Sequence, residues 1–231
     1  MENSNAINIT LCVYTNCTSC NSSNTRLLTK TLQSFIECFD IKSISEVVIY
    51  CDPNPNINQY DTYIKQVKDI QKMFENIPFR ILKTKSLSDG YYKSIINSKT
   101  KYIFQLEHDW IFLKQNILHT LDNILNEMEQ FEIPYMRFNK RKNVICGSDL
   151  YLEEIKLQKF SVCKTPNMSN NPHIINRDFY YSNNYHKAIK IKHGNKGIEE
   201  ELQAKYQNGY IYGGLNNEPT ISHLDGKKKY L

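Results

Sequence analysis

The chain has 231 residues, of which 40% are hydrophobic and 23% are charged, and its formal net charge at neutral pH is +5. With 16 Tyr and 10 Phe spread along its length, it has enough apolar side chains for a hydrophobic core, which argues against a disordered protein. No apolar stretch approaches the roughly 20 residues that a membrane-spanning helix requires, so we expect no transmembrane segment.

The basic balance comes mainly from lysine, and the lysines are interleaved with acidic residues along the chain. Proteins that read DNA favour arginine forks and gather their basic side chains in one patch. We therefore expect no nucleic-acid partner. Two explanations of the charge stay open, namely solvated lysines, including the run Lys227–Lys229, and a small anionic ligand such as a nucleoside diphosphate.

The N-terminal residues and the cysteines suggest a compartment. Residues 1–5 lack the basic and apolar regions of a signal peptide, which predicts a cytoplasmic protein. The pair Cys17 and Cys20 has the spacing of a zinc or redox motif, but no second pair follows at zinc-finger spacing. We therefore expect the cysteines to be reduced structural thiols.

Strands and helices alternate through the first half of the chain. The hydrophobic patterns predict strands over residues 7–14, 47–51, 79–82 and 101–106, and helices over 25–39, 60–74 and from a cap at Ser88-Asp89 to about Asn97. Such alternation predicts an α/β fold, Rossmann-like, with a mostly parallel sheet flanked by helices. Ligands bind beyond the carboxyl ends of the strands in these sheets, here just after Tyr14, Cys51 and Leu106.

The second half of the chain is less regular. We expect a helix over 115–129, a strand over 135–138 and a helix over 197–207, with short strands and loops between them. No repeat and no linker rich in Pro or Gly divides the chain. The sequence therefore predicts a single domain over residues 1–231 with an irregular C-terminal part.

An acidic segment, Glu107-His108-Asp109, directly follows the apolar strand at 101–106. In an extended chain Glu107 and Asp109 point to the same side, so both carboxylates would reach the edge of the sheet where ligands bind. Oxygen ligands of this kind bind Mg²⁺ or Mn²⁺, especially when a diphosphate supplies further oxygens. The alternative is an ordinary charged turn, and Trp110 next to it is expected to pack in the core.

These residues resemble the GT-A class of glycosyltransferases, in particular the inverting family 2. In that class a strand ends in a short DxD motif, which Glu107-His108-Asp109 matches as ExD, and residues 90–103 resemble the helix and strand that precede it. The resemblance implies that Asp109 and Glu107 bind Mn²⁺ or Mg²⁺ on the diphosphate. It also implies that Tyr14, Thr15 and Asp52 hold the nucleoside.

Two later segments fit the same resemblance. Gly197-Ile198-Glu199-Glu200 is similar to the family's G-x-E-D segment, which implies that Glu200 or Glu199 is the general base for the acceptor hydroxyl. A helix N-terminus enriched in acids is the alternative. His223 resembles the histidine that completes the metal coordination. His173 and Arg177 are weaker candidates for contacts with acceptor or phosphate.

The resemblance covers residues 7–225 and implies a nucleotide-sugar-binding half at 1–110 and an acceptor-binding half at 111–231. The implied function is metal-dependent, inverting transfer of a sugar from a nucleoside-diphosphate sugar to a hydroxyl of a glycan, polysaccharide or glycoprotein. One alternative is a non-catalytic carbohydrate- or nucleotide-binding protein on a decayed transferase fold. Another is a sugar nucleotidyltransferase, which the absence of glycine from residues 15–24 disfavours.

Overall fold

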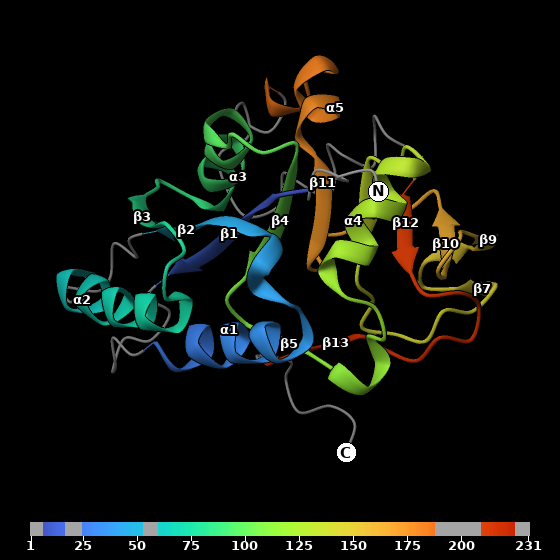
Figure 1. Cartoon of the computed structure of the whole chain (residues 1–231), viewed down its shortest axis with the longest axis horizontal. Helices are drawn as coiled ribbons and strands as arrows, with labels where there is room; N and C mark the ends of the chain where they lie inside the picture. The colour runs from blue at the N-terminus through green and yellow to red at the C-terminus, as the bar shows by residue number, and fades with distance from the viewer. Residues whose placement is uncertain (1–6, 17–24, 53–59, 188–208, 225–231) are drawn as a thin grey trace, which may run out of the picture.

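A nine-stranded sheet runs through the centre of the molecule and carries helices on both faces (Figure 1). This computed structural model describes residues 7–16, 25–52, 60–187 and 209–224. The strands of the large sheet are β1 (Ile9–Asn16), β2 (Ile44–Asp52), β3 (Phe79–Lys83), β4 (Tyr102–Glu107), β6 (Tyr135–Arg137), β9 (Glu153–Lys156), β10 (Ser161–Thr165), β11 (His173–Asn176) and β12 (Gly209–Tyr212). Two small antiparallel pairs are formed by β5 (Trp110–Phe112) with β13 (Ile221–His223) and by β7 (Cys146–Gly147) with β8 (Leu150–Tyr151).

The helices of the described residues lie between these strands in sequence. They are α1 (Arg26–Cys38), α2 (Tyr60–Ile70), α3 (Leu87–Asn97), α4 (Leu121–Gln130) and α5 (Arg177–Ser182), with short 3₁₀ turns η1 (Ile41–Ser43), η2 (Gln71–Phe74) and η3 (Lys114–Asn116). In this part of the chain no helix is long and apolar enough to cross a bilayer.

The sheet has the order β3-β2-β1-β4-β11-β6-β12-β10-β9. Strands β3, β2, β1 and β4 are parallel, as the βαβ pattern predicted. In the second half β11 is antiparallel to β4 and to β6, and β10 is antiparallel to β12 and to β9. Strand β12 is parallel to β6, so parallel pairing continues into the second half, and the predicted α/β sheet flanked by helices is confirmed.

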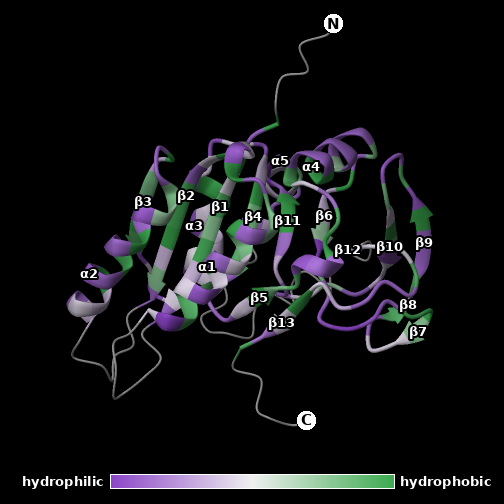
Figure 2. Ribbon diagram, turned by 60° about the horizontal axis from the view of Figure 1, so that its bottom comes forward, coloured by the Kyte–Doolittle hydropathy of each residue, from purple (hydrophilic) through white to green (hydrophobic). Residues whose placement is uncertain are grey.

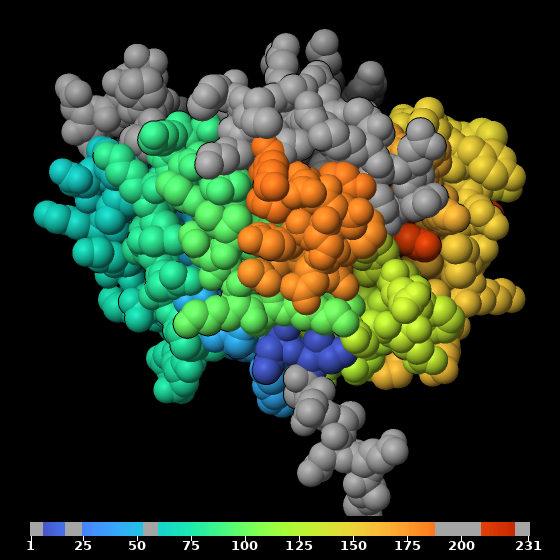
Figure 3. Space-filling model, turned by 90° about the horizontal axis from the view of Figure 1, so that it is seen from above, coloured from blue at the N-terminus to red at the C-terminus, as the bar shows by residue number. Residues whose placement is uncertain are grey.

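Alternate side chains of the central strands supply two hydrophobic cores, because successive residues of a strand point to opposite faces. Leu11 and Val13 of β1 belong to the cluster that includes Phe35 of α1, whereas Cys12 and Tyr14 belong to the cluster of α3 and α5. Hydrophobic residues accordingly concentrate in the central strands in Figure 2. The space-filling view of Figure 3 shows α5 in orange at the centre of its face, beside the green surface of α3.

Several predicted boundaries were wrong, for reasons that lie in local capping. The helix expected to begin at residue 115 begins at Leu121, because the Thr120 side chain accepts a hydrogen bond from the Asn123 N–H at 3.2 Å and caps it. The cap of α3 is Ser86, whose hydroxyl accepts from the Asp89 N–H at 3.2 Å, and Ser88 lies inside the helix. The helix expected over 197–207 lies outside the described residues.

The described cysteines are free thiols, as expected. They are Cys12, Cys38, Cys51, Cys146 and Cys163. Burial raises the pKa of the Cys51 thiol to about 12, so this side chain behaves as a small apolar group. The pair Cys17 and Cys20 lies outside the described residues.

Candidate functional site

A cleft of about 260 Å³ opens where β1, β2 and β4 end. It is lined by Tyr14, Thr15, Asn16, Tyr50, Asp52, Thr84, Leu87, Glu107, His108, Asp109 and Asn170. The cleft therefore brings together the five residues that the sequence assigned to the nucleoside and to the acidic segment, namely Tyr14, Thr15, Asp52, Glu107 and Asp109.

The register of the parallel strands explains this convergence. Tyr14 of β1 is paired with Tyr50 of β2 and with Glu107 of β4, and Asn16 is paired with Asp52. Because parallel strands end at the same edge of the sheet, polar residues that follow three apolar strands are carried to one place.

Stacked tyrosines form one wall of the cleft. The ring of Tyr14 lies 4.2 Å from the ring of Tyr91 and 5.4 Å from that of Tyr50, centroid to centroid and nearly parallel. The Tyr14 hydroxyl donates a hydrogen bond to Gln105 Oε1, and Gly90 of α3 packs against the ring. The stack and the hydrogen bond hold Tyr14 in place, so this wall is rigid.

Thr15 and Asp52 lie at the ends of β1 and β2. The Thr15 hydroxyl is hydrogen-bonded to the Tyr63 hydroxyl of α2. Partial burial of the Asp52 carboxyl, assisted by the nearby charge of Asp89, raises its pKa above the usual value. Asp52 is therefore a carboxylate whose hydration is already reduced, which favours a hydrogen bond from a ligand.

The acidic segment is a turn and not the extended chain that the sequence predicted. Strand β4 ends at Glu107, and the chain turns through His108 and Asp109 before β5 begins at Trp110. Two hydrogen bonds fix the turn, since the His108 N–H donates to the Tyr14 carbonyl at 3.0 Å and the Thr31 hydroxyl donates to the His108 carbonyl at 2.7 Å. Both Glu107 and Asp109 still line the cleft.

His223 is brought to Asp109 by the pairing of β13 with β5. His223 is opposite Trp110 in this pair, and the Leu224 N–H donates to the Asp109 carbonyl at 2.7 Å. The His223 Nε2 atom lies 3.0 Å from Asp109 Oδ2. Trp110 is 5% exposed, and its ring packs edge-on against the His223 ring with 4.6 Å between the centroids. Trp110 therefore packs in the core, as expected, and supports His223.

The carboxylate of Asp109 is held in its charged form. Burial acts to raise its pKa, but the hydrogen bond with His223 and the neighbouring His108 outweigh burial, so the pKa lies below the usual range. The Oδ1 atom of Asp109 is buried and has no hydrogen-bond partner in the described part of the chain. A carboxylate oxygen that accepts no hydrogen bond is suited to bind a cation.

Asp109 and His223 are in contact and are the candidate protein ligands for a cation, and the Glu107 carboxylate lines the same cleft as Asp109. Within residues 7–16, 25–52, 60–187 and 209–224, no group of three or more His, Cys, Asp or Glu side chains forms a metal-binding cluster. A cation held by Asp109 and His223 would therefore take its remaining ligands from a bound molecule and water. Carboxylate oxygen and imidazole nitrogen together suit Mn²⁺.

Asn16 and Asn170 also line the cleft, and sequence reasoning did not single them out. The side-chain oxygen of Asn16 is buried and has no hydrogen-bond partner in the described ranges. Asn16 could have been predicted to line the cleft, because it directly follows Tyr14 and Thr15 at the end of the first strand. Asn170 comes from a loop far along the chain, and no local pattern places it here.

The two weaker candidates, His173 and Arg177, do not line the cleft. His173 is 1% exposed, its Nδ1 is 2.7 Å from the Asn171 carbonyl, and it packs against Tyr135, so the hypothesis of contact with an acceptor or phosphate was wrong for this residue. Arg177 donates to the Ile95 carbonyl at 2.9 Å and pairs with Asp178. Glu199 and Glu200, the predicted bases, lie outside the described residues.

Comparison with known proteins gave results at the level of the fold. No family model matches the sequence, and no curated protein sequence matches it either. The structure is similar to that of GalNAc-T7 with UDP, GalNAc and Mn²⁺, with a TM-score of 0.61 at 13% identity over 96% of this chain and 45% of that one. It is also similar to S. aureus TarS 1-349, with a TM-score of 0.58 at 11% identity over 93% of this chain and 60% of that one. The complex of TarS 1-349 with UDP-GlcNAc gives a TM-score of 0.58 at 11% identity over 97% of this chain and 62% of that one.

The fold is therefore that of the GT-A glycosyltransferases. The chain spans less than two thirds of the length of each of these structures. At such low identities the similarity establishes the architecture of the sheet and helices.

Proposed function

We propose that this chain is a metal-dependent glycosyltransferase that moves a sugar from a nucleoside-diphosphate sugar to a hydroxyl acceptor. The observation that carries the proposal is the contact of His223 at 3.0 Å with Asp109, which lines the cleft at the ends of β1, β2 and β4. In support, the GT-A structures named above contain UDP with Mn²⁺ or UDP-GlcNAc.

Asp109 and His223, with Glu107 beside them, are the proposed holders of Mn²⁺ or Mg²⁺. The buried Asp109 Oδ1 atom without a donor supports this assignment. A cation at this place would neutralise negative charge on the leaving diphosphate. The protein's own part is to keep Asp109 ionised and to orient His223 against Trp110.

Tyr14, Thr15 and Asp52 are the proposed nucleoside contacts. The rigid tyrosine stack offers an apolar wall for a base or ribose, and the partly buried Asp52 carboxylate accepts hydrogen bonds from ligand N–H or O–H groups. Asn16, with its amide oxygen unpartnered in the described chain, adds a further acceptor. Uridine is the nucleoside that we propose, on the precedent of the UDP complexes.

The acceptor side belongs to the second half of the chain, residues 111–231. We propose that Glu200, or Glu199, takes the proton of the acceptor hydroxyl as it attacks the anomeric carbon, which inverts that centre as in family 2. A carboxylate within hydrogen-bond reach is needed because a sugar hydroxyl is a weak nucleophile at neutral pH. The acceptor would be a glycan, polysaccharide or glycoprotein.

The test is a panel of UDP, GDP, CDP and dTDP sugars with Mn²⁺, in which release of the nucleoside diphosphate is measured with and without a chelator. We expect metal-dependent release from a UDP sugar. Tight binding of UDP without release from any donor would favour instead a non-catalytic binding protein on a transferase fold. Formation of nucleotide sugar from a nucleoside triphosphate and a sugar phosphate would identify a nucleotidyltransferase.

A further inference from the structure

A segment at the same edge of the sheet as the cleft presents basic and apolar side chains together to solvent. We call residues 140–151 the basic-apolar loop; it contains the β7–β8 hairpin. Ten of its twelve residues are exposed, and the two buried ones are Asn143 and Asp149. In Figure 2 the hairpin lies along the same margin of the molecule as β5 and β13, which carry Trp110 and His223.

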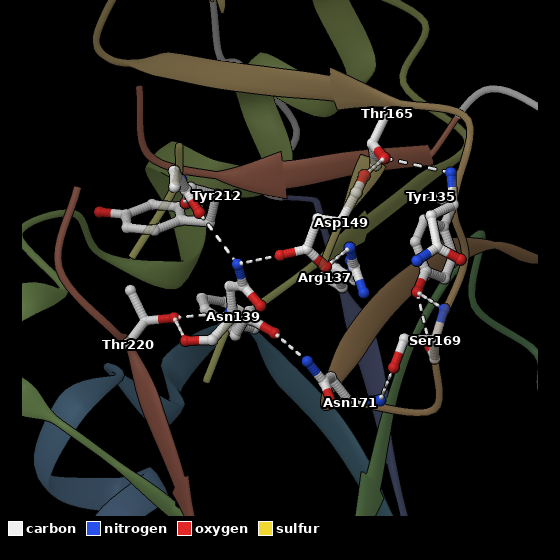
Figure 4. Close-up of polar contacts among 12 residues, drawn as sticks. Tyr135, Arg137, Asn139, Asp149, Thr165, Ser169, Asn171, Tyr212 and Thr220 are labelled. Atoms are coloured by element: carbon white, nitrogen blue, oxygen red, sulfur yellow. Dashed lines mark hydrogen bonds and ion pairs between the residues drawn. The ribbon is translucent and has the colours of Figure 1, made fainter. Parts of the chain in front are cut away.

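The two buried residues fix the loop to the body of the protein. Asp149 forms an ion pair with Arg137 at 2.6 Å, in which both side chains are almost fully buried, and its second oxygen accepts from Asn139 Nδ2 at 3.0 Å. Figure 4 shows Arg137 and Asn139 converging on Asp149. Thr165 donates its hydroxyl to the Asp149 carbonyl at 2.7 Å.

Asn143 is the second attachment. Its Nδ2 atom donates to the carbonyls of Gly213 and Gly214 at 3.1 and 3.2 Å, and its Oδ1 accepts from Asn139 at 3.1 Å. Buried, hydrogen-bonded polar networks of this kind specify one conformation. The exposed side chains of the loop are therefore presented on a fixed framework.

The apolar part of the loop is unusually exposed for such side chains. The exposed fractions are 42% for Val144, 52% for Ile145, 56% for Leu150 and 65% for Tyr151. Leu150 has a backbone φ of 63°, a left-handed conformation that a leucine rarely adopts. Clustered exposed aliphatic and aromatic residues on a rigid loop indicate an interaction surface.

The basic part lies next to it in the chain. Lys140, Arg141 and Lys142 are all exposed, and Glu218 offsets one of their charges through an ion pair with Lys142 at 2.8 Å. Lys140 Nζ lies 5.7 Å from the Trp110 ring, so the basic run extends to the residue that supports His223. Three basic side chains next to four apolar ones are complementary to a lipid surface, in which anionic headgroups cover an apolar layer of acyl chains.

We propose that the basic-apolar loop binds the surface of a membrane that contains anionic lipids. Lys140, Arg141 and Lys142 contact the headgroups, and Val144, Ile145, Leu150 and Tyr151 enter the boundary between headgroups and acyl chains. Because the loop and the cleft share one edge of the sheet, this attachment would bring the cleft to the membrane surface. Membrane binding by this loop does not depend on the proposed transfer reaction.

The test is co-sedimentation of the full chain with vesicles of phosphatidylcholine, with and without phosphatidylglycerol. We expect binding to the anionic vesicles that weakens as salt is raised. The double variant Arg141→Glu/Lys142→Glu should lose about 10-fold or more in affinity, since each basic residue near such a surface contributes about 5-fold. The double variant Ile145→Ser/Tyr151→Ser should also lose about 10-fold.

Matched controls lie elsewhere on the surface. Lys68→Glu/Lys72→Glu on α2 and η2, at the other end of the sheet (Figure 1), removes the same charge. Tyr181→Ser removes a side chain that is 51% exposed on α5, at the margin opposite β7 and β8 (Figure 2). Both controls should bind as the unchanged protein does. Unchanged thermal melting of every variant shows that each is folded.

The proposal is overturned if the loop variants bind vesicles as the controls do, or if binding is absent or equal on neutral vesicles. Sedimentation equilibrium provides the rival outcome. A dimer that dissociates in Ile145→Ser/Tyr151→Ser would assign the apolar side chains to a second copy of this chain and would also overturn the proposal.

Discussion

The His223 imidazole meets the Asp109 carboxylate at 3.0 Å, and this contact joins a strand near the end of the chain to the turn that follows β4. Asp109 thereby has one oxygen oriented by a neighbour and one buried oxygen without a donor in the described residues. Such a pair either binds a cation or serves only to hold β13 on β5, and the two roles give different results in experiments.

The first prediction concerns His223→Gln. Glutamine keeps a hydrogen-bonding side chain but replaces the imidazole ligand, so we expect Mn²⁺ affinity to fall by about 10–100-fold. A Mn²⁺ titration followed by electron paramagnetic resonance measures this directly. His119→Gln is the control, because His119 is bonded to the Tyr212 hydroxyl away from the cleft. Equal Mn²⁺ affinity in both variants would make His223 purely structural.

A second prediction concerns Gly90→Ala. A Cβ atom at Gly90 would lie 2.8 Å from Tyr14 Cδ1, and Tyr14 is held by its stacking partners Tyr50 and Tyr91. We expect a loss of about 1–3 kcal/mol in the free energy of unfolding, although alanine is the better helix former. UDP binding should weaken too, because Tyr14 lines the cleft. Urea denaturation and calorimetric titration with UDP measure the two effects.

The exposed position Asn97 on the same helix supplies the control for this change. Asn97→Ala should be neutral or slightly stabilising in the same denaturation experiment. If Gly90→Ala were as stable as Asn97→Ala and bound UDP normally, the tyrosine wall would be more adaptable than its stacking indicates.

The three strand ends that form the cleft followed from the sequence because they depend on local pattern. Apolar runs followed by polar residues predict that Tyr14, Asp52 and Glu107 lie at strand ends. Parallel pairing then brings these strand ends to one edge of the sheet. Residues 107–109 were expected to be extended, but hydrogen bonds from Thr31 and to Tyr14 bend them into a turn. The partners in those hydrogen bonds lie in distant segments of the chain, so the local sequence does not predict the turn.

The contact of His223 with Asp109 could be suggested by resemblance to a family, but residue spacing alone could not place it. It depends on the antiparallel pairing of β13 with β5, two short strands far apart in the chain. The basic-apolar loop was missed for a related reason. No local pattern marks the apolar Val144 and Ile145 as exposed, and it is the polar Asn143 and Asp149 near them that are buried.

A third prediction concerns the dependence of stability on pH. Burial, opposed by the hydrogen bond with the Asn171 carbonyl and assisted by the charge of Arg137, lowers the pKa of His173 to about 4. Between about pH 6.5 and this value the unfolded chain binds a proton that the folded chain does not, so stability falls as the pH falls through this window. The loss should reach about 3 kcal/mol.

The variant His173→Gln removes this titration. Its free energy of unfolding, measured with urea, should change less than that of the unchanged protein between about pH 6.5 and about pH 5, where ordinary carboxylates are still ionised. Asn97→Ala, at an exposed position, removes no titratable group and should keep the original slope. Identical slopes for all three proteins would mean that His173 is protonated in the folded state.

A fourth prediction concerns the buried ion pair of Arg137 and Asp149. Asp149→Asn leaves the Arg137 charge buried without its partner, which should cost about 3–5 kcal/mol of unfolding free energy. The double variant Arg137→Met/Asp149→Asn should cost less than the sum of the two single changes, because no unpaired charge remains. Urea denaturation of the four proteins measures this coupling.

The exposed pair of Lys72 and Asp69, at 3.4 Å, is the comparison for that cycle. Lys72→Met should change the unfolding free energy by less than about 1 kcal/mol. Additive effects at Arg137 and Asp149 would show that the pair does not anchor the basic-apolar loop through its charge.

The most direct test of the account is the fifth prediction, the metal-dependent turnover of a nucleotide sugar by Asp109→Asn. Asparagine has nearly the same shape and keeps an oxygen toward His223, so the fold should be retained, as a thermal melt would show. The variant has lost the anionic oxygen, and turnover with Mn²⁺ should fall by about 100-fold or more. Asp178→Asn, on the exposed surface of α5, is the matched control and should retain full activity. Undiminished Mn²⁺-dependent turnover by Asp109→Asn would contradict the assignment of the site.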